Sequence, residues 1–271
     1  MSSWNAAARP RKPFVPQGAQ VPHNAVICCI ALDEEPYIDE WIQYHLHIGF
    51  THIYIYDNSP SHTLRSKTSQ LVTVLPFPGS SQQLIAYNLF VQTYKRKHTW
   101  AAFIDCDEFI VLKKHTSIAD LLREYHDCQA LALQWIMFGT SHEVSYRDEP
   151  VTKRFQHCSK DVHPLFKSIC KLSIIQDYKN PHKPRLLSGN VVDTNWKTIP
   201  FHENEHPSGP VDVACIHHYY TKSEEEFRKK IERGKADMDE KRSQDELIDI
   251  HLQNNDVINM DAWNVYSQQR A

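Results

Sequence analysis

Asp105 and Asp107 stand two residues apart at the end of an apolar run, where they could bind a divalent cation. Carboxylate oxygens with an added imidazole are ligands that suit Mg²⁺ or Mn²⁺. An isolated Asp-x-Asp pair is more often a solvated turn. Here the flanking segments 100–104 and 109–112 are strongly apolar, so the neighbouring acids would repel one another in a poorly solvated place. Because a bound cation would remove that repulsion, we expect a metal site at this position.

Further candidate ligands lie late in the chain, where His217 and His218 precede Lys222 and Ser223. Adjacent side chains of a strand point to opposite faces, so only one of the two histidines can bind the same ion. The residues alone leave open whether His217 or His218 is the ligand, and a hydrogen-bonded core role is the alternative for either histidine. Lys222 directly precedes a helix start at Ser223, which places it well to neutralise phosphate oxygens.

The elements that must position these residues alternate between strands and helices. Runs of apolar or alternating residues predict strands at 25–32, 52–57, 71–75, 100–104, 130–137 and 211–217. Apolar residues at helical spacing predict helices at 38–46, 81–97 and 117–125. This order indicates an α/β domain with a mainly parallel sheet. The polar candidates follow the carboxyl ends of the strands, where such sheets bind their ligands.

Two capping boxes, Ser117 to Asp120 and Ser223 to Glu226, mark further helix starts. In the second of these helices we expect ion pairs at i,i+4 spacing between Glu225 and Lys229 and between Glu226 and Lys230. For residues 139–188 the pattern is irregular, and it predicts long loops with a strand near 169–175.

Composition excludes several classes of protein. The 271 residues carry a net charge of −3, which gives no electrostatic excess for binding nucleic acid or an anionic membrane. The seven glycines are too far apart to form a dinucleotide fingerprint or a phosphate-binding P-loop. The longest apolar run, 25–32, is far shorter than the roughly 20 residues of a membrane span. Seven cysteines without a C-x-x-C pair favour a reducing compartment, so we expect a cytoplasmic protein.

The distribution of residue types along the sequence divides the chain into three parts. Residues 1–23 are rich in proline and basic side chains and read as a flexible arm. Residues 24–235 hold all of the predicted alternating elements and form the main domain. Residues 236–271 form a polar extension, which we expect to pack on the domain through Trp263.

Six blocks of sequence, in this order, resemble glycosyltransferase family 92, a branch of the family-2-like GT-A enzymes. They are DEEPYIDEWIQYHLHIGF at 33–50, IYIYDNS at 53–59, DCDEF at 105–109, WIMFG at 135–139, FKSI at 166–169 and HYYTKSEEEF at 218–227. The resemblance spans residues 27–234 and is far more specific than a single Asp-x-Asp pair. It implies a single Rossmann-like GT-A domain, a nucleotide-sugar donor and a divalent metal. Members without membrane anchors also occur in bacteria and in large DNA viruses, so a host cytoplasm is a further expectation.

The resemblance implies a role for each matching position. Asp57 would hold the nucleoside of the donor, and Asp105 would hold its ribose or the metal. Asp107 and His218 would bind the metal. Lys167 and Lys222 would lie near the diphosphate of the donor. Glu34, after the first strand, would also bind the donor. The chain departs from the family pattern at Asp33-Glu34, where Asn-Glu is usual, and at Ser61-His62, which replaces the usual acid after the second-strand turn.

The acceptor is expected at the loop after 135–138. Trp135 could stack on a sugar face and His142 could contact the acceptor, while Glu143 is the candidate general base of an inverting reaction. For each of these the alternative is structural, a core tryptophan and exposed loop residues.

We therefore predict transfer of a sugar from a nucleotide sugar, with a UDP-sugar as the first expectation, to a hydroxyl of a glycan, with Mn²⁺ or Mg²⁺ as cofactor. Two alternatives stay open. A non-catalytic protein that binds carbohydrate or nucleotide sugar would need all of these residues except the base. A metal-dependent phosphohydrolase also uses aspartates at strand ends, although the Asp-Cys-Asp-Glu-Phe segment lacks the Thr or Gly that usually follows its nucleophile.

Overall fold

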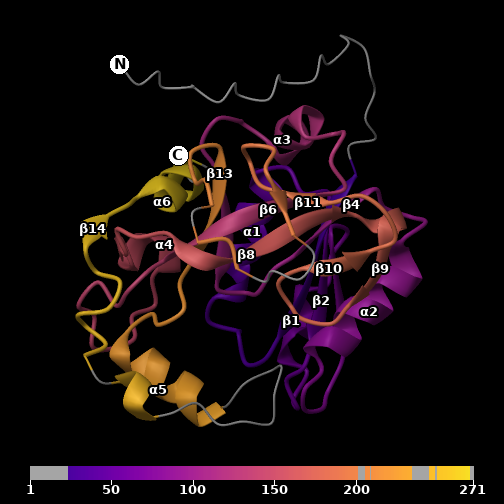
Figure 1. Ribbon diagram of the computed structural model, residues 1–271. Coiled ribbons are helices and arrows are strands. Elements are labelled where there is room, and N and C mark those ends of the chain that lie inside the picture. The colour runs from indigo at the N-terminus through magenta and orange to yellow at the C-terminus, as the bar shows by residue number, and fades with distance from the viewer. Residues whose placement is uncertain (1–23, 201–204, 208, 234–243, 248, 269–271) are drawn as a thin grey trace, which may run out of the picture.

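A ten-stranded mixed sheet forms the centre of the computed structural model, which describes residues 24–200, 205–207, 209–233, 244–247 and 249–268 (Figure 1). Its strands are β1 (Ala25–Ala31), β2 (His52–Asp57), β3 (Val72–Pro76), β4 (Trp100–Phe103), β5 (Glu108–Leu112), β6 (Ala130–Met137), β8 (His163–Lys171), β11 (Val191–Val192), β12 (Thr198–Ile199) and β13 (Ala214–His218). Two small sheets pair β7 (His157–Cys158) with β14 (Val257–Ile258), and β9 (Ile175–Tyr178) with β10 (Pro184–Leu186).

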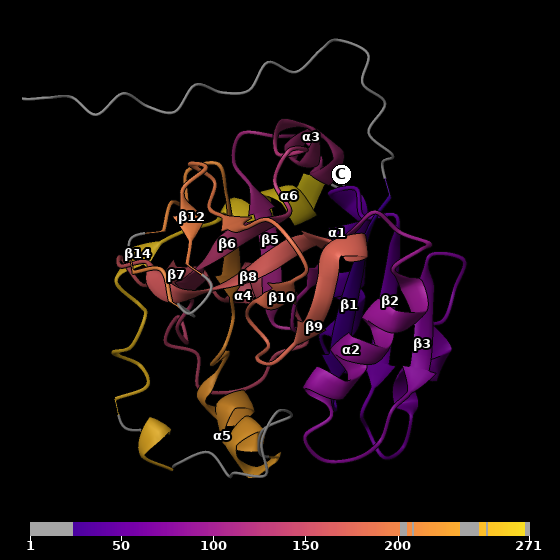
Figure 2. The same ribbon diagram turned by 45° about the vertical axis from the view of Figure 1, so that its right-hand side comes forward.

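The α-helices of the described residues are α1 (Ile38–His47), α2 (Gln83–Tyr94), α3 (Ile118–Glu124), α4 (Val151–Arg154), α5 (Glu224–Arg233) and α6 (Asp261–Gln268). Short 3-10 helices lie at Thr63–Lys67, Leu172–Ile174 and Gln244–Leu247. In both views of the molecule α5 lies at the opposite end from α3 (Figures 1 and 2). Both predicted capping boxes are present, because the hydroxyl of Ser117 accepts from the amide of Asp120 and that of Ser223 accepts from the amide of Glu226.

The sheet runs in the order β12-β11-β6-β8-β4-β1-β2-β3, and β13 pairs with both β5 and β6. The pairs β4-β1, β1-β2, β2-β3, β11-β6 and β13-β6 are parallel. β8 is antiparallel to both of its neighbours, β4 and β6. The predicted α/β domain with a mainly parallel sheet is therefore confirmed.

Two hydrophobic layers cover the two faces of the sheet, and β1 shows how one strand serves both. Its residues alternate, so that Ile27 and Cys29 pack in the layer that contains α1, while Val26 and Cys28 pack in the layer that contains α2. All seven residues of β1 are buried. The continuous apolar run at 25–32 follows from this burial on both faces, because a strand with one solvated face would alternate with polar residues.

The prediction for residues 139–188 is wrong in one important respect. The strand predicted near 169–175 overlaps the end of β8, but β8 is a nine-residue strand in the middle of the large sheet, and its first six residues fall where loops were expected. Its central residues, Phe166 to Cys170, are buried, and they include Lys167 and Ser168. A buried lysine breaks the apolar pattern of a strand, so the pattern hid an element that tertiary contacts stabilise.

Segments after residue 243 return to the main domain. β14 pairs with β7, the ring of Trp263 packs against the larger core cluster, and the hydroxyl of Tyr266 donates to the side-chain oxygen of Gln43 at 3.1 Å. The expected arm, residues 1–23, lies outside the described residues, as do residues 234–243, where the predicted boundary at 235/236 falls.

All seven cysteines are buried and unpaired. The middle residue of the Asp-x-Asp segment, Cys106, points into the core, where its sulfur lies 4.0 Å from that of Cys29. Its acidic neighbours Asp105 and Asp107 are therefore free to turn away from the core toward the same edge of the sheet.

Candidate active site

Asp105 and Asp107 lie in the turn between β4 and β5, and β13 brings His218 beside them. β13 runs antiparallel to β5 with His218 opposite Glu108. The backbone amide of Tyr219 donates to the carbonyl oxygen of Asp107 at 2.8 Å, which fixes the end of β13 against this turn. Two segments more than 100 residues apart in the chain thus meet at one edge of the sheet.

The carboxylate of Asp107 has a different partner on each oxygen. Oδ1 lies 3.4 Å from Nε2 of His218, and Oδ2 accepts a hydrogen bond from Nζ of Lys230 at 2.6 Å. The exposed fraction of these three side chains is 11% or less. Burial alone would raise the pKa of Asp107, but Lys230 and His218 together hold it well below its usual value. Asp107 is therefore an ionised carboxylate, and an ammonium group compensates its charge.

Asp105 and Glu108 share a second lysine. Nζ of Lys167, a buried residue, lies 3.0 Å from Oδ2 of Asp105 and 3.8 Å from Oε1 of Glu108. The other oxygen of Asp105 accepts from the amide of Gln83 at 2.7 Å and from the hydroxyl of Tyr87 at 3.4 Å. Burial raises the pKa of Glu108 well above its usual value, because its charged form is poorly solvated. Lysine side chains thus compensate the charge of the acid cluster in this structure.

His217 and His218 point to opposite faces of β13, as the sequence predicted. The ring of His217 lies in the core 4.6 Å from the ring of Phe138, and neither of its nitrogens has a hydrogen-bond partner. Burial lowers the pKa of His217 to about 3, so the imidazole is neutral. His218 faces Asp107, and its Nδ1 is buried without a hydrogen-bond partner. Of the two, only His218 is placed to share a ligand with Asp107.

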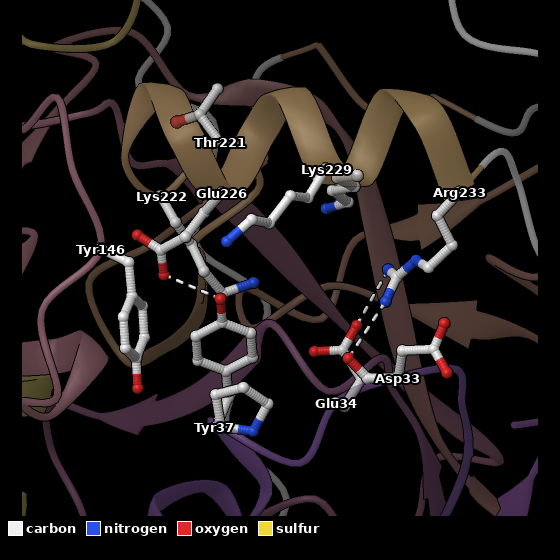
Figure 3. Close-up of a pocket in the computed structure, with 11 residues that line it drawn as sticks. Asp33, Glu34, Tyr37, Tyr146, Thr221, Lys222, Glu226, Lys229 and Arg233 are labelled. Carbon is white, nitrogen blue, oxygen red and sulfur yellow. Dashed lines mark hydrogen bonds and ion pairs between the residues drawn. The ribbon is translucent and has the colours of Figure 1, made fainter. Parts of the chain in front are cut away.

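A pocket of about 350 Å³ lies beside this cluster, between α5 and the loop after β1 (Figure 3). The loop after β1, the turn before α5 and the inward face of α5 supply most of its walls. The lining residues are Asp33, Glu34, Pro36, Tyr37, Tyr146, Thr221, Lys222, Glu226, Lys229, Lys230 and Arg233. Basic side chains from a single helix therefore face acids that follow a strand of the sheet.

The ion pairs of α5 differ in part from those predicted. Lys229 pairs with Glu225 at 2.7 Å, as expected for i,i+4 spacing. The expected pair of Glu226 with Lys230 is wrong, because Glu226 binds the buried guanidinium of Arg154 at 2.7 Å. Lys230 extends to Asp107 instead. Burial outweighs local spacing here, because the buried carboxylate of Glu226 and the buried guanidinium of Arg154 each need an opposite charge as a partner.

Sequence reasoning missed Lys230 and Arg233 as residues of the site. Arg233 pairs with Glu34 at 3.0 Å and also donates to the carbonyl oxygen of Leu32, so the end of α5 is joined to the loop after β1 (Figure 3). A signal was present in the spacing, because Lys230 follows the buried Phe227 by three residues and so lies on the same face of α5.

The predicted donor residues are spread along this edge. Glu34 and Lys222 line the pocket, and Nζ of Lys222 lies 4.4 Å from the ring centre of Tyr37. Asp57 is buried, and its two oxygens accept from the backbone amides of Ser59 at 3.0 Å and Leu64 at 3.3 Å. Asp57 therefore stabilises the loop after β2, and its predicted contact with the nucleoside of the donor would be an additional role.

The predicted acceptor residues do not form one cluster. Trp135 is buried beside His218, with ring centres 4.4 Å apart, and its Nε1 has no hydrogen-bond partner. Glu143 is bound by the guanidinium of Arg147 through both oxygens. His142 adopts a left-handed backbone conformation with φ of 63°, and its ring lies 5.6 Å from that of His157.

Asp107 and His218 are the predicted metal ligands that the structure brings together. Asp105 is turned toward Lys167 instead. Within the described part of the chain, His, Cys, Asp and Glu side chains do not form a group of three or more that could hold a metal ion. A cation at Asp107 and His218 would therefore need oxygen ligands from a bound molecule or from water.

None of the described helices is both long enough and apolar enough to cross a membrane.

The chain is similar to known proteins over most of its length. The family model of glycosyltransferase family 92 matches residues 23–255. A family 92 protein of Ricinus communis is 23% identical over 223 residues, which cover 76% of this chain and 36% of that protein. One from Oryza sativa subsp. japonica is 26% identical over 109 residues, covering 38% of this chain and 19% of that protein. The chain thus spans little more than a third of the length of the Ricinus relative.

Among solved structures, similarity is found to Staphylococcus aureus TarS 1-349. The TM-score is 0.33 at 15% identity, with 55% of this chain and 47% of that chain covered. For the same protein in complex with UDP the TM-score is 0.32 at 17% identity, with 46% and 38% covered. The family assignment comes from the sequence match, which covers both the Asp105–Asp107 turn and α5. The chain belongs to glycosyltransferase family 92.

Proposed function

We propose that this chain transfers a sugar from a nucleotide sugar, with a UDP-sugar as the first choice, to a hydroxyl group of a glycan, and that it uses Mn²⁺ or Mg²⁺. The observation that carries the proposal is the approach of Asp107 Oδ1 to His218 Nε2 at 3.4 Å beside a pocket lined by basic residues. One hard oxygen ligand and one imidazole at this separation suit a single cation. Family membership supplies the class of reaction.

The residues fit a divalent cation that arrives with the donor. Asp107 is ionised, and His218 has its Nε2 directed at Asp107, so both can act as ligands. Diphosphate oxygens would complete the coordination. When bound, the cation would act as a Lewis acid that stabilises the charge of the leaving diphosphate.

The chain's own groups would orient the donor and receive the proton. Asp105, which contacts Gln83 and Lys167, would bind the ribose, and Lys222, which lines the pocket, would bind the phosphates. In an inverting reaction the acceptor oxygen forms a bond to the anomeric carbon from the face opposite the diphosphate. The bond from that carbon to the phosphate oxygen breaks, and the diphosphate keeps the electron pair.

We propose Glu143 as the base that takes the proton of the acceptor hydroxyl, with Trp135 and His142 on the acceptor side. Because Glu143 is bound by Arg147, it must exchange this partner for the acceptor. That contact also favours the alternative of a non-catalytic binding protein, because such a protein needs the donor pocket and no base. Cysteines that are all buried and unpaired support a reducing compartment, and we propose the cytoplasm.

Release of nucleoside diphosphate from UDP-, GDP- and dTDP-sugars, with glycan acceptors present, tests the proposal. We expect turnover with one donor class, loss of turnover in chelator, and recovery with Mn²⁺ or Mg²⁺. Ca²⁺ at equal concentration should not restore turnover, because it prefers more ligands at longer distances. Tight donor binding without turnover would establish the binding protein instead, and equal turnover in chelator would refute metal dependence.

A further inference from the structure

Two cations of α5 lie between the pocket and the acids of the sheet. Lys230 donates to Asp107 Oδ2 at 2.6 Å and to the backbone oxygen of Tyr220 at 2.8 Å. Arg233, one turn further along α5, pairs with Glu34 at 3.0 Å. Lys230 and Arg233 both line the pocket. Figure 3 shows Arg233 at one end of α5 and Lys222 near the other end. One helix thus carries two cations that touch both the pocket and its acidic wall.

The hydrogen bonding around Arg233 is incomplete. Its Nε is buried without a hydrogen-bond partner, and so is Oε2 of Glu34, the acid to which it is paired. A buried donor without an acceptor is unfavourable, and this donor belongs to a residue that lines the pocket. Lys222, Lys229 and Lys230 line the same pocket, so a multiply charged oxyanion fits its chemistry.

The contact of Lys230 with Asp107 conflicts with the use of Asp107 as a metal ligand. An ammonium group at 2.6 Å from Oδ2 occupies one side of the carboxylate and compensates its charge. A lysine has a flexible four-carbon stem and three donor hydrogens, so it can turn from one anion to another without a change in the backbone. Arginine offers a fixed fork that suits phosphate oxygens.

We propose that Lys230 and Arg233 form an exchangeable counter-ion pair, which in the ligand-free chain binds Asp107 and Glu34 and in the loaded chain binds the diphosphate group. Diphosphate binding removes Lys230 from Asp107, and the carboxylate becomes available to a divalent cation. This inference rests on the proposed function and extends it, because it assigns the diphosphate to α5 and explains how one carboxylate serves two partners.

Metal and diphosphate binding are coupled by this exchange. If the diphosphate alone takes Lys230, the buried carboxylate of Asp107 loses its hydrogen-bonded ammonium group, which is unfavourable. If a cation alone approaches Asp107, it must displace the ammonium of Lys230. Each ligand therefore lowers the cost of binding the other, and by linkage the effect is the same in both directions.

Titration of the full chain with sodium pyrophosphate in EDTA, followed by calorimetry, tests the exchange without any metal. Asp107→Asn should bind pyrophosphate about tenfold more tightly than the wild type, because Lys230 no longer has to leave a charged partner. Lys230→Gln should bind about tenfold more weakly. Arg228→Gln is the matched control, since it removes a cation of the same helix that pairs with Glu224 and does not line the pocket. Its affinity should equal that of the wild type.

A double variant separates loss of the cation from loss of the fold. Lys230→Gln leaves Asp107 without its ammonium partner and can destabilise the chain, whereas Asp107→Asn with Lys230→Gln removes both charges. The double variant should bind pyrophosphate as weakly as Lys230→Gln alone. Unchanged or weaker binding by Asp107→Asn, or tight binding by the double variant, would refute the exchange.

The same proteins distinguish this inference from the proposed function. Pyrophosphate results as expected, together with no turnover of any nucleotide sugar, would support the exchange and refute the transferase. Turnover of a nucleotide sugar by a wild type whose pyrophosphate affinity does not respond to Asp107→Asn or Lys230→Gln would support the transferase and refute the exchange.

Discussion

The rings of Trp135 and His218 meet edge to face, with centres 4.4 Å apart and planes inclined at 63°. Trp135 is 6% exposed, and His218 is the imidazole that faces Asp107. The indole therefore limits the orientations that the imidazole of His218 can adopt. Trp135, which the sequence analysis assigned to the acceptor side, thus also contacts the proposed metal ligand.

Replacing the indole should affect both stability and metal use. Trp135→Ala removes a large buried ring, and we expect a loss of about 3–5 kcal/mol in the free energy of unfolding. Trp135→Phe keeps an aromatic edge against His218 and should retain most of the stability and the Mn²⁺ requirement of the wild type. Urea unfolding and Mn²⁺ titration of turnover give the two readouts. If Trp135→Phe changes only the apparent affinity for the acceptor, the acceptor role is correct and the supporting role is wrong.

The two histidines at the end of β13 offer a matched pair of variants. His218→Ala should raise the Mn²⁺ concentration required for turnover about tenfold or more, because one of two protein ligands is lost. His217→Ala should leave the Mn²⁺ requirement unchanged and lower the free energy of unfolding by about 2–4 kcal/mol, since its ring is fully buried against Phe138. Metal titrations and denaturant unfolding of both variants decide between ligand and core roles. The reversed pattern would assign the metal to the other histidine.

Buried histidines should make the fold sensitive to acid. Burial lowers the pKa of His45 from 6.5 to about 3, while its Nδ1 binds the carbonyl oxygen of Trp41 and its Nε2 accepts from the amide of Ile110. Between pH 6.5 and 3 the unfolded chain binds a proton that the folded chain does not. Stability is therefore complete above about pH 6.5 and falls as the pH decreases, by up to about 1.4 kcal/mol per pH unit for each such histidine.

Unfolding in urea at pH 7, 6 and 5 measures this slope. His45→Gln keeps a donor and an acceptor but cannot titrate, so its stability should fall less steeply with decreasing pH than that of the wild type. His47→Gln, at a solvent-exposed position of the same helix, is the control and should not alter the slope. An identical slope in the His45 variant would show that folding does not lower the pKa of this imidazole.

A buried ion pair joins the pocket to α4. Glu226 accepts from both terminal nitrogens of Arg154, and from the hydroxyl of Tyr37 at 2.8 Å. Glu226→Gln should lower the free energy of unfolding by about 3–5 kcal/mol, because it leaves the buried Arg154 without a counter-charge. Thermal unfolding checks this. Glu225→Gln, which alters an exposed ion pair on the neighbouring position, should unfold like the wild type.

The sequence allowed prediction of those parts of the fold that local patterns determine. β1 is a continuous apolar run, β6 is apolar except for Gln134, and the start of α3 is determined by Ser117 and Asp120 within one turn. A general rule about strand ends, together with the alternation of faces in a strand, predicted that one of His217 and His218 would lie near the acids, and the family resemblance pointed to His218. These predictions did not require knowledge of any long-range charge.

Charge compensation could not be predicted from local patterns. The acid cluster at 105–108 suggested a bound cation, but the structure places Lys167 and Lys230 beside it, from segments about 60 and 120 residues further along the chain. Most of β8 was missed for the same reason. The buried ammonium group of Lys167 within this strand is stabilised by Asp105 and Glu108, which lie outside the strand. A buried charge is evident in a sequence only when its partner is close by in that sequence.

The burial of every native cysteine makes selective labelling of this chain straightforward. Burial raises the pKa of Cys128 and of Cys215 to about 12, and thiol reagents attack only the thiolate, so the folded protein should react slowly with maleimides. A cysteine introduced at the exposed position of Arg228 would then carry a fluorophore on α5 at the cost of one exposed ion pair, that with Glu224. Emission from such a dye could follow, in real time, whether the helix shifts when a phosphate ligand binds.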